Sequence, residues 1–331
     1  MSVRTVSRNM FPLLLVLLIG QPFAFAQVDY TQEEYDRFQS AVKADLASRE
    51  DAIVEFIKSS QSSLVPHAVK SYVQLLLDYR NKGQWQKVVS AGDKFLAVQP
   101  EDSTALNITA YGAFQVQQFA KAARYWEKVY PHNSDPWLAK YIATSYIQLK
   151  NEGKYIEYGE KACGQLAPKD CYEILGELSK AYAGRKQWAK AAEYAEKLLQ
   201  GFEGAQKPAQ TSQQEWSEYL NREKATAYGL IGRRAAERGR WGTAITNYQK
   251  VLGLSKFPAL NGEAFYFIGM GRWKQNRVDP AMEAFARGSV QRGAPHARRC
   301  RQYLETLYKS THNDSLAGIE EFIERVSRRR R

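Results

Sequence analysis

The chain has 331 residues, a formal net charge of +12, and 20 tyrosines, 14 phenylalanines and 7 tryptophans. Its length suits two conventional domains or one elongated repeat array. No sustained alternation of apolar and polar residues is present, so the pattern argues against a sheet and favours an all-α array.

Positive charge is concentrated in the C-terminal part of the chain. Residues 27–200 contain 22 Lys and Arg against 22 Asp and Glu, whereas residues 201–331 contain 23 against 13. The excess could be a solvated face that keeps the protein soluble, or a patch for acidic proteins, anionic lipid head groups or acidic cell-wall polymers. The candidate basic patch consists of Arg298, Arg299, Arg301, Arg328, Arg329, Arg330 and Arg331.

The first 26 residues have the three parts of a secretory signal peptide. Arg4 and Arg8 precede an apolar run from Met10 to Ile19, and Ala24 and Ala26 form a small-x-small cleavage site. The run falls short of the roughly 20 apolar residues that span a bilayer. We expect cleavage after Ala26, with an uncleaved anchor as the alternative. The mature chain would then be periplasmic or envelope-associated, without a transmembrane span and away from most nucleic acid.

Helical spacing of apolar residues defines the predicted elements in chain order. Residues 27–66 are predicted to form a degenerate N-terminal helix pair, in which Tyr35 and Phe38 share one face. Residues 67–200 contain clearer helix hairpins. In the first of them, Tyr72 and Tyr79 precede a turn at Gly83.

The composition changes after Gln200. Residues 201–212 are rich in Gly, Gln, Ala and Lys, and we predict an exposed linker there. Ser212 and Glu215 then have capping-box spacing, and no helix breaker stands between Gln213 and Glu237. This pattern predicts one long first helix within a second group of hairpins at 213–293, whose first turns project beyond the ordinary repeat. Two capping helices and a basic tail follow at 294–331.

The most complete hairpin extends from Ala225 to Pro258. Tyr228 and Gly232 lie on the first helix, the turn is at Gly239, and Ala244 lies on the second helix. This arrangement resembles the tetratricopeptide repeat, a helix-turn-helix unit of about 34 residues. The resemblance implies a right-handed superhelical solenoid of antiparallel helix pairs, with capping helices at both ends.

Two stretches depart from the repeat pattern. Val88 stands where Ala is usual and Gly92 where a large residue is usual, so we expect looser packing there. The hairpin from Trp137 to Leu166 fits the pattern only with an insertion around Lys150 to Glu152.

Three cysteines follow the predicted signal peptide. Cys163 and Cys171 flank a loop that contains Gly164 and Pro168. In an oxidising compartment they could form a disulfide between successive repeats, or both could be buried thiols near a helix junction. Cys300 is expected to be a packed thiol.

No catalytic motif stands out. The four histidines are far apart, and neither a paired zinc-ligand motif, a nucleophile elbow nor a phosphate-binding loop is present. We therefore expect no enzymatic activity, no metal and no cofactor.

Binding is the function that the resemblance implies. The first helices of such repeats line a groove, and aromatic, methionine and basic side chains there provide adaptable contacts and charge. The alternative for Tyr111, Tyr266 and Trp273 is ordinary packing between repeats. The predicted groove residues are Asn107, Tyr111, Phe114, Lys180, Arg233, Tyr266, Met270 and Trp273.

Three hypotheses follow for the whole chain. The first is a scaffold of the bacterial cell envelope that captures proteins or peptides in this groove. The second is a peripheral module that binds anionic lipid or cell-wall polymer through its basic C-terminal part. The third is an accessory subunit of a polysaccharide-export or outer-membrane assembly system.

Overall fold

The computed structural model describes residues 29–45 and 48–328, which contain sixteen α-helices and no strand. This architecture confirms the all-α fold class. The predicted signal peptide at 1–26 and the arginines at 329–331 lie outside the described residues.

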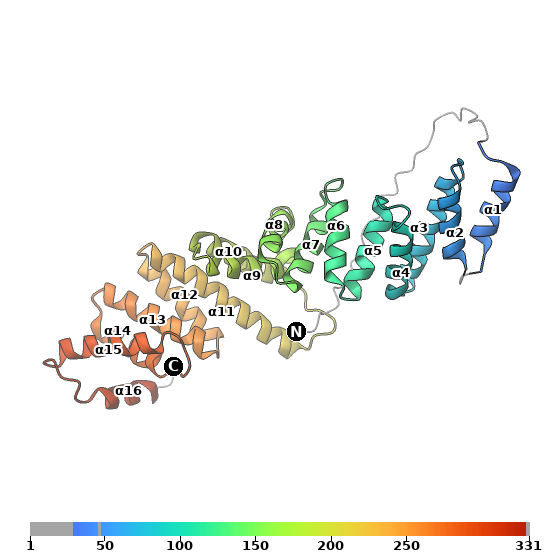
Figure 1. Cartoon of the computed structure of the whole chain (residues 1–331). Helices are drawn as coiled ribbons and strands as arrows, with labels where there is room; N and C mark the ends of the chain where they lie inside the picture. The colour runs from blue at the N-terminus through green and yellow to red at the C-terminus, as the bar shows by residue number, and fades with distance from the viewer. Residues whose placement is uncertain (1–28, 46–47, 329–331) are drawn as a thin grey trace. The chain divides into compact units, whose positions relative to one another are not determined.

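The described helices fall into two compact units, one ending at Ala162 and the other starting at Cys163. Figure 1 shows the helices of each unit. The first unit contains α1 (Gln32–Lys43), α2 (Arg49–Ser59), α3 (Val65–Asn81), α4 (Trp85–Leu96), α5 (Ser103–Gln115), α6 (Phe119–Val129), α7 (Pro136–Gln148) and α8 (Glu152–Cys163). The last residue of α8, Cys163, already belongs to the second unit. The second contains α9 (Pro168–Gly184), α10 (Trp188–Gly204), α11 (Gln213–Glu237), α12 (Trp241–Leu254), α13 (Pro258–Lys274), α14 (Val278–Ser289), α15 (Ala297–Thr311) and α16 (Ile319–Arg328).

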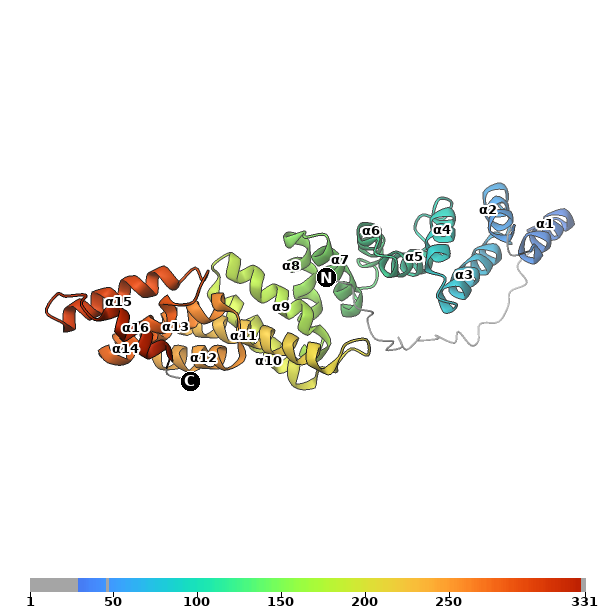
Figure 2. The same ribbon diagram turned by 90° about the horizontal axis from the view of Figure 1, so that it is seen from below.

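Within each unit, the second helix of a hairpin packs on the first helix of the next hairpin. In the second unit, α10 contacts α11, α12 contacts α13 and α14 contacts α15. The first helices also contact one another, from α9 through α11 and α13 to α15. Figure 2 shows α12 to α15 next to one another in a second view. Each first helix is therefore covered on several sides by neighbours, and its remaining face is the candidate binding surface.

The same turn joins the two helices in six hairpins. One residue has positive φ at each turn: Gly83, Gln117, Lys150, Lys186, Gly239 and Asn276. In all six, the next residue donates its backbone N–H to a carbonyl five positions earlier, over 2.8–3.0 Å. These are the bonds of a Schellman helix end.

The turn at Lys150 shows that the predicted insertion is wrong. Lys150 has φ 56°, and Asn151 bonds back to Tyr146 as in the other hairpins. Successive turns lie 34, 33 and 36 residues apart, at Gly83, Gln117, Lys150 and Lys186. A lysine can occupy the left-handed position at a cost in free energy, which hid the regular turn from the sequence pattern.

The expected loose packing around Val88 and Gly92 is also wrong. Val88 is fully buried, and a Cβ added at Gly92 would lie 2.0 Å from Oγ1 of Thr109. A Cβ at Gly112 would lie 2.6 Å from Val88. The valine and the two glycines are therefore complementary, and they allow α4 and α5 to approach closely.

The predicted linker at 201–212 is too long. Helix α10 continues to Gly204, because Phe202 is buried against Tyr172 and Tyr219, with ring centroids 5.6 and 6.1 Å away. The connection is reduced to residues 205–212. The long helix Gln213–Glu237 and its Ser212–Glu215 capping box are confirmed. Its first turns pack on α10 through these rings instead of projecting alone.

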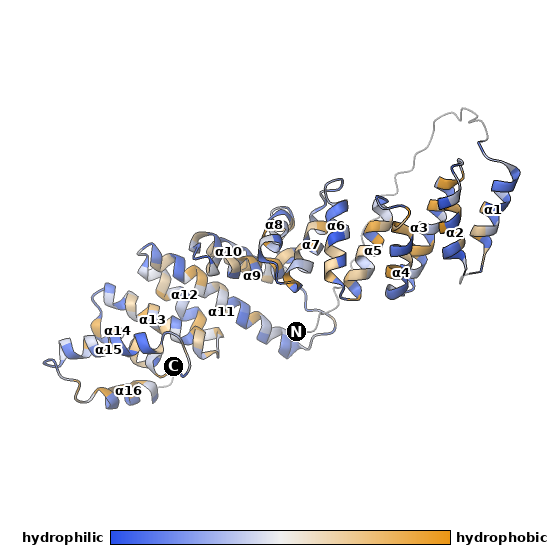
Figure 3. Ribbon diagram, in the orientation of Figure 1, coloured by the Kyte–Doolittle hydropathy of each residue, from blue (hydrophilic) through white to orange (hydrophobic). Residues whose placement is uncertain are grey.

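Apolar residues are distributed along every helix rather than collected in a few (Figure 3). At the C-terminal end, Leu304 and Tyr308 of α15 join Ile319 and Ile323 of α16 in one buried cluster with α14. These two helices therefore cover the last hairpin, which would otherwise expose its apolar side to water. None of the described helices combines the length and the apolar composition needed to cross a bilayer.

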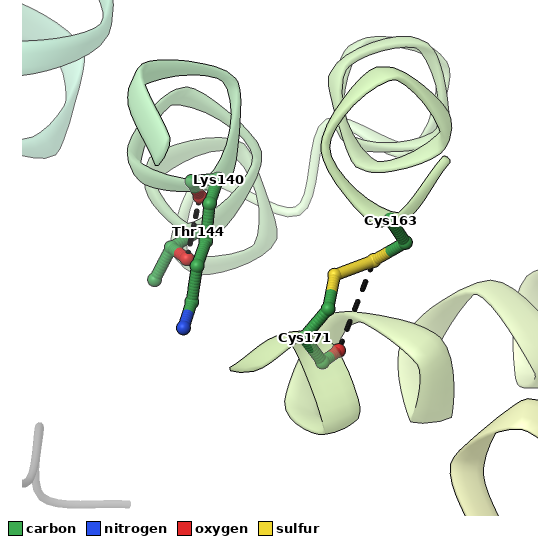
Figure 4. The surroundings of a disulfide bond; sticks show 4 residues. All are labelled: Lys140, Thr144, Cys163 and Cys171. Atoms are coloured by element: carbon green, nitrogen blue, oxygen red, sulfur yellow. Dashed lines mark hydrogen bonds between the residues drawn. A yellow bond between two sulfur atoms is a disulfide. The ribbon is translucent and has the colours of Figure 1, made fainter. Parts of the chain in front are cut away.

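Cys163 and Cys171 form a disulfide, with their Cα atoms 5.7 Å apart. It joins the last residue of α8 to the first turn of α9 (Figure 4). Cys300 is a buried free thiol, whose pKa is raised to about 12 by burial.

A pair of glycine substitutions tests the turn geometry. Gly239→Ala should lower the free energy of unfolding by about 1 kcal/mol, because alanine is strained at φ 70°. Gly242→Ala, three residues later in α12, has open space for its Cβ and should raise it by about 0.5 kcal/mol. Urea unfolding followed by circular dichroism measures both. Equal effects of the two substitutions would contradict the turn.

Reduction tests the disulfide. A crosslink that closes a loop of this length stabilises a fold by about 2 kcal/mol. Dithiothreitol should therefore lower the urea midpoint of the wild-type chain and leave the midpoint of a Cys163→Ala, Cys171→Ala double variant unchanged. An identical midpoint for the oxidised and reduced wild-type chain would show that the bond contributes nothing.

Candidate binding surface

The predicted groove residues belong to two units, and each unit is described by itself. In the first unit, Asn107 is exposed on α5 and accepts a hydrogen bond from Nε1 of Trp126, at 2.9 Å. Tyr111 is partly buried between the rings of Trp85 and Tyr141, at 5.6 and 6.0 Å. These two residues reach the surface of α5.

The prediction that Phe114 contacts a partner is wrong. Its side chain is 4% exposed, and its ring lies 5.5 to 5.7 Å from those of Phe119, Trp126 and Tyr141. Phe114 therefore belongs to the core between α5, α6 and α7.

Lys180 of α9 already has acidic partners. Its Nζ lies 3.1 Å from both Glu177 and Glu223, and Arg222 is a second partner of Glu223, at 3.2 Å. Burial disfavours the charge of Lys180, but the two carboxylates outweigh burial and raise its pKa. Since Glu223 is buried, the lysine compensates an internal charge, which argues against its predicted role of receiving a partner's carboxylate.

Arg233 of α11 is held between two aromatic rings from other hairpins. Its guanidinium carbon lies 4.8 Å from the ring centroid of Trp188 on α10 and 4.7 Å from that of Phe267 on α13. Nη2 also contacts Glu237, at 2.8 Å. Cation–π contacts on this scale fix the side chain in one orientation.

The next first helices continue this surface. Tyr266 and Trp273 are partly buried on α13, and Tyr303 lies between them on α15, with ring centroids 5.9 and 5.7 Å away. His296 occupies the position before the first residue of α15, and its ring lies 5.1 Å from that of Tyr266. Tyr266 and Trp273 therefore pack between hairpins, as the alternative prediction states, and each side chain remains partly exposed.

Met270 lies between these residues in the same stripe of α13, partly buried against the cluster of α14, α15 and α16. We define the aromatic–basic face by the side chains of three consecutive first helices. Its residues are Arg233, Tyr266, Met270, Trp273, His296, Arg299 and Tyr303.

The electrostatics of the face are set by its arginines. The pKa of His296 is lowered by burial and then by the charges of Arg299 and Arg233, so the imidazole is neutral at pH 7. Burial and Tyr303 raise the pKa of Tyr266. Glu263 on α13 accepts a hydrogen bond from Tyr248 Oη at 3.1 Å, and burial raises the pKa of its carboxyl group.

His296 and Tyr303 were not predicted from the sequence, and Arg299 was assigned to the basic patch rather than to the groove. His296, Arg299 and Tyr303 follow one another at spacings of three and four residues, which place them on one side of α15. That spacing is visible in the sequence. It was not used, because residues 294–331 were interpreted as capping helices with a basic patch.

The predicted basic patch is divided by internal ion pairs. Arg301 contacts Glu305 at 2.5 Å and Glu320 at 2.6 Å, and Arg328 pairs with Glu324. Arg298 and Arg299 are exposed, and no ion pair involves either within residues 29–45 and 48–328. Among these same residues, no group of three or more His, Cys, Asp or Glu side chains is arranged to hold a metal ion.

Two lysine substitutions test the internal charge network. Lys180→Met removes one partner of the buried Glu223 carboxylate and leaves Arg222, so the free energy of unfolding should fall by about 1–2 kcal/mol. Lys197→Met removes an exposed ion pair with Glu193 on α10 and should change it by less than about 0.5 kcal/mol. Urea unfolding compares them, and equal losses would refute a special role for Lys180.

No protein-family model matches the sequence, and no curated protein matches it. Similar solved structures include YrrB, described as a tetratricopeptide-repeat protein with an unusual peptide-binding site. It is 16% identical, with 64% of this chain and 98% of that chain covered and a TM-score of 0.44. MamA is 16% identical, with coverage of 55% and 88% and a TM-score of 0.40. PilF of Pseudomonas aeruginosa is 14% identical, with coverage of 71% and 96% and a TM-score of 0.39.

The chain's own geometry identifies its fold. Antiparallel helix hairpins, a shared turn and turn spacings of 34, 33 and 36 residues between Gly83 and Lys186 are the features of tetratricopeptide repeats. The described helices therefore have the tetratricopeptide-repeat fold.

Proposed function

We propose that this protein is a non-enzymatic scaffold that binds polypeptide segments on its aromatic–basic face. One observation carries the proposal: three consecutive first helices place partly exposed tyrosine, tryptophan and arginine side chains next to one another. These residue types contribute most of the binding energy in protein interfaces.

Preorganisation of the face supports this function. Arg233 is fixed by Trp188 and Phe267, and the ring of Tyr303 is fixed by those of Tyr266 and Trp273. A side chain that is already ordered loses little conformational entropy when a partner binds. The face can therefore bind a segment without rearranging the hairpins.

The proposed setting is the bacterial cell envelope. Its support is the signal-peptide pattern of residues 1–26 and the disulfide between Cys163 and Cys171, because disulfides persist in oxidising compartments. In this setting the scaffold would serve an envelope complex, either independently or as an accessory subunit of a polysaccharide-export or outer-membrane assembly system.

Binding of anionic lipid or cell-wall polymer through the basic C-terminal part is less well supported. Arg301 and Arg328 are paired with glutamates, which reduces the charge available to a polyanion. Arg298 and Arg299 retain exposed charge, but Arg299 belongs to the aromatic–basic face.

Capture of partners tests the proposed function. Immobilised chain beginning at Gln27 should retain specific proteins from an envelope extract, and Trp273→Ala should reduce their affinity about tenfold because it removes an aromatic anchor. Phe257→Ala is the matched control, since Phe257 is 50% exposed but lies outside the face. Circular dichroism checks that both variants are folded. If the folded Trp273→Ala variant retains the same proteins as the wild-type chain, the aromatic–basic face does not bind them.

A further inference from the structure

We propose that the segment bound by the aromatic–basic face is acidic, an internal run of Asp or Glu side chains, and that His296 makes this binding tighter as the pH falls below neutral. This inference rests on the proposed function and names the chemistry and the regulation of the same surface.

The acidic character of the segment is argued from the charges of the face. Arg299 is exposed, and it has no ion pair within residues 29–45 and 48–328. Arg233 has one carboxylate partner, Glu237, and stays partly exposed. Residues 201–331 carry 23 basic against 13 acidic side chains, so the surroundings also attract an acidic segment.

Acidic side chains that enter the face meet arginine and aromatic groups together. Arginine is the preferred donor to carboxylates because its planar group can make two parallel hydrogen bonds. Tyr266 and Tyr303 provide ring surface and hydroxyl groups beside it. The chemistry of the face therefore matches a run of carboxylates better than a basic or uniformly apolar segment.

His296 is placed so that its charge depends on what the face holds. The charged groups that face it are Arg233 and Arg299, and its ring lies 5.1 Å from that of Tyr266 and 6.3 Å from that of Phe267. Two further carboxylates lie beside Arg233, Glu237 on α11 and Glu263 on α13. Tyr303 on α15 adds a phenol.

The direction of the pH effect follows from linkage. In the free protein, burial and the two arginines hold the pKa of His296 below its ordinary value, so the imidazole is neutral near pH 7. A carboxylate placed among these groups offsets the arginines and raises that pKa. The complex then holds a proton that the free protein lacks. Affinity must therefore increase as the pH falls from above the bound-state pKa towards the free-state pKa.

The acidic ligand stays charged in this range. Unperturbed Asp and Glu side chains titrate near pH 4, so they stay charged between pH 7.5 and pH 5.5. A difference of one unit between the free and bound pKa of His296 corresponds to about a tenfold change in affinity. We expect roughly a threefold to tenfold gain between pH 7.5 and pH 5.5.

A peptide library identifies the ligand class without a known partner. Phage-displayed random 12-residue peptides are selected on the folded chain beginning at Gln27, at pH 6.0. Selected sequences are synthesised with acetylated and amidated ends, so that no terminal carboxylate contributes. Each has a matched peptide in which Asp and Glu are replaced by Asn and Gln. Fluorescence anisotropy gives the Kd of each peptide between pH 7.5 and pH 5.5.

Variants separate the two parts of the proposal. Arg299→Gln should weaken the acidic peptides about tenfold at pH 7.5, where His296 is neutral, because it removes an unpaired cation. His296→Gln should abolish the pH dependence of binding. His312→Gln is the matched control: its ring stacks on Tyr308 of α15, away from the face, and the pH dependence should persist.

The outcomes are distinguishable. Acidic selected peptides that lose affinity as amides and bind more tightly at pH 5.5, through His296, support the proposal. Tight binding of the amide peptides, or binding that does not vary with pH, overturns it and leaves the polypeptide-binding function in place. If no selected peptide depends on Arg299, Trp273 or His296, both this inference and the proposed function are overturned.

Discussion

The packing of each second helix on the next first helix is the contact on which the rest of the structure depends. It buries the apolar side of every hairpin, and it needs the hairpin to close at a fixed angle. The shared turn supplies that angle, through one left-handed residue and a backbone hydrogen bond that spans five positions. Because the second helix covers one side of the first, the first helices α9, α11, α13 and α15 contact one another in turn and present their remaining side chains together. The packing thus leaves one face of these helices uncovered, and the side chains at those positions determine what the face could bind.

In the unit from Cys163 onward, side chains of the proposed binding face also hold neighbouring hairpins together. Arg233 lies between Trp188 and Phe267, so one residue connects three consecutive hairpins and also presents charge to solvent. The charge of Lys180, in contrast, is used inside the protein, because it compensates the buried carboxylate of Glu223. Two basic residues on neighbouring first helices therefore differ in how far their acidic partners are buried.

Much of the fold could be predicted from the sequence, and the reasons for the failures are physical. Helical spacing and a capping box were sufficient to predict α11 with its observed ends. The turn at Lys150 was mistaken for an insertion because the pattern expects glycine where a strained lysine stands. The linker was drawn too long because composition does not show that Phe202 has aromatic partners far along the chain. The candidate face was found only in part: exposure and pairing decide which residues are available, and the sequence shows neither. Phe114 was therefore misassigned, and His296 was overlooked.

The most direct test of the central claim locates a bound acidic peptide on the protein. The seven tryptophans give indole N–H signals in a proton–nitrogen correlation spectrum, and tryptophan-to-phenylalanine variants assign them. A selected peptide that carries a nitroxide label should broaden the signals of Trp273 and Trp188, which lie in and beside the aromatic–basic face. Broadening of Trp126 or Trp137 in place of Trp273 would contradict the account.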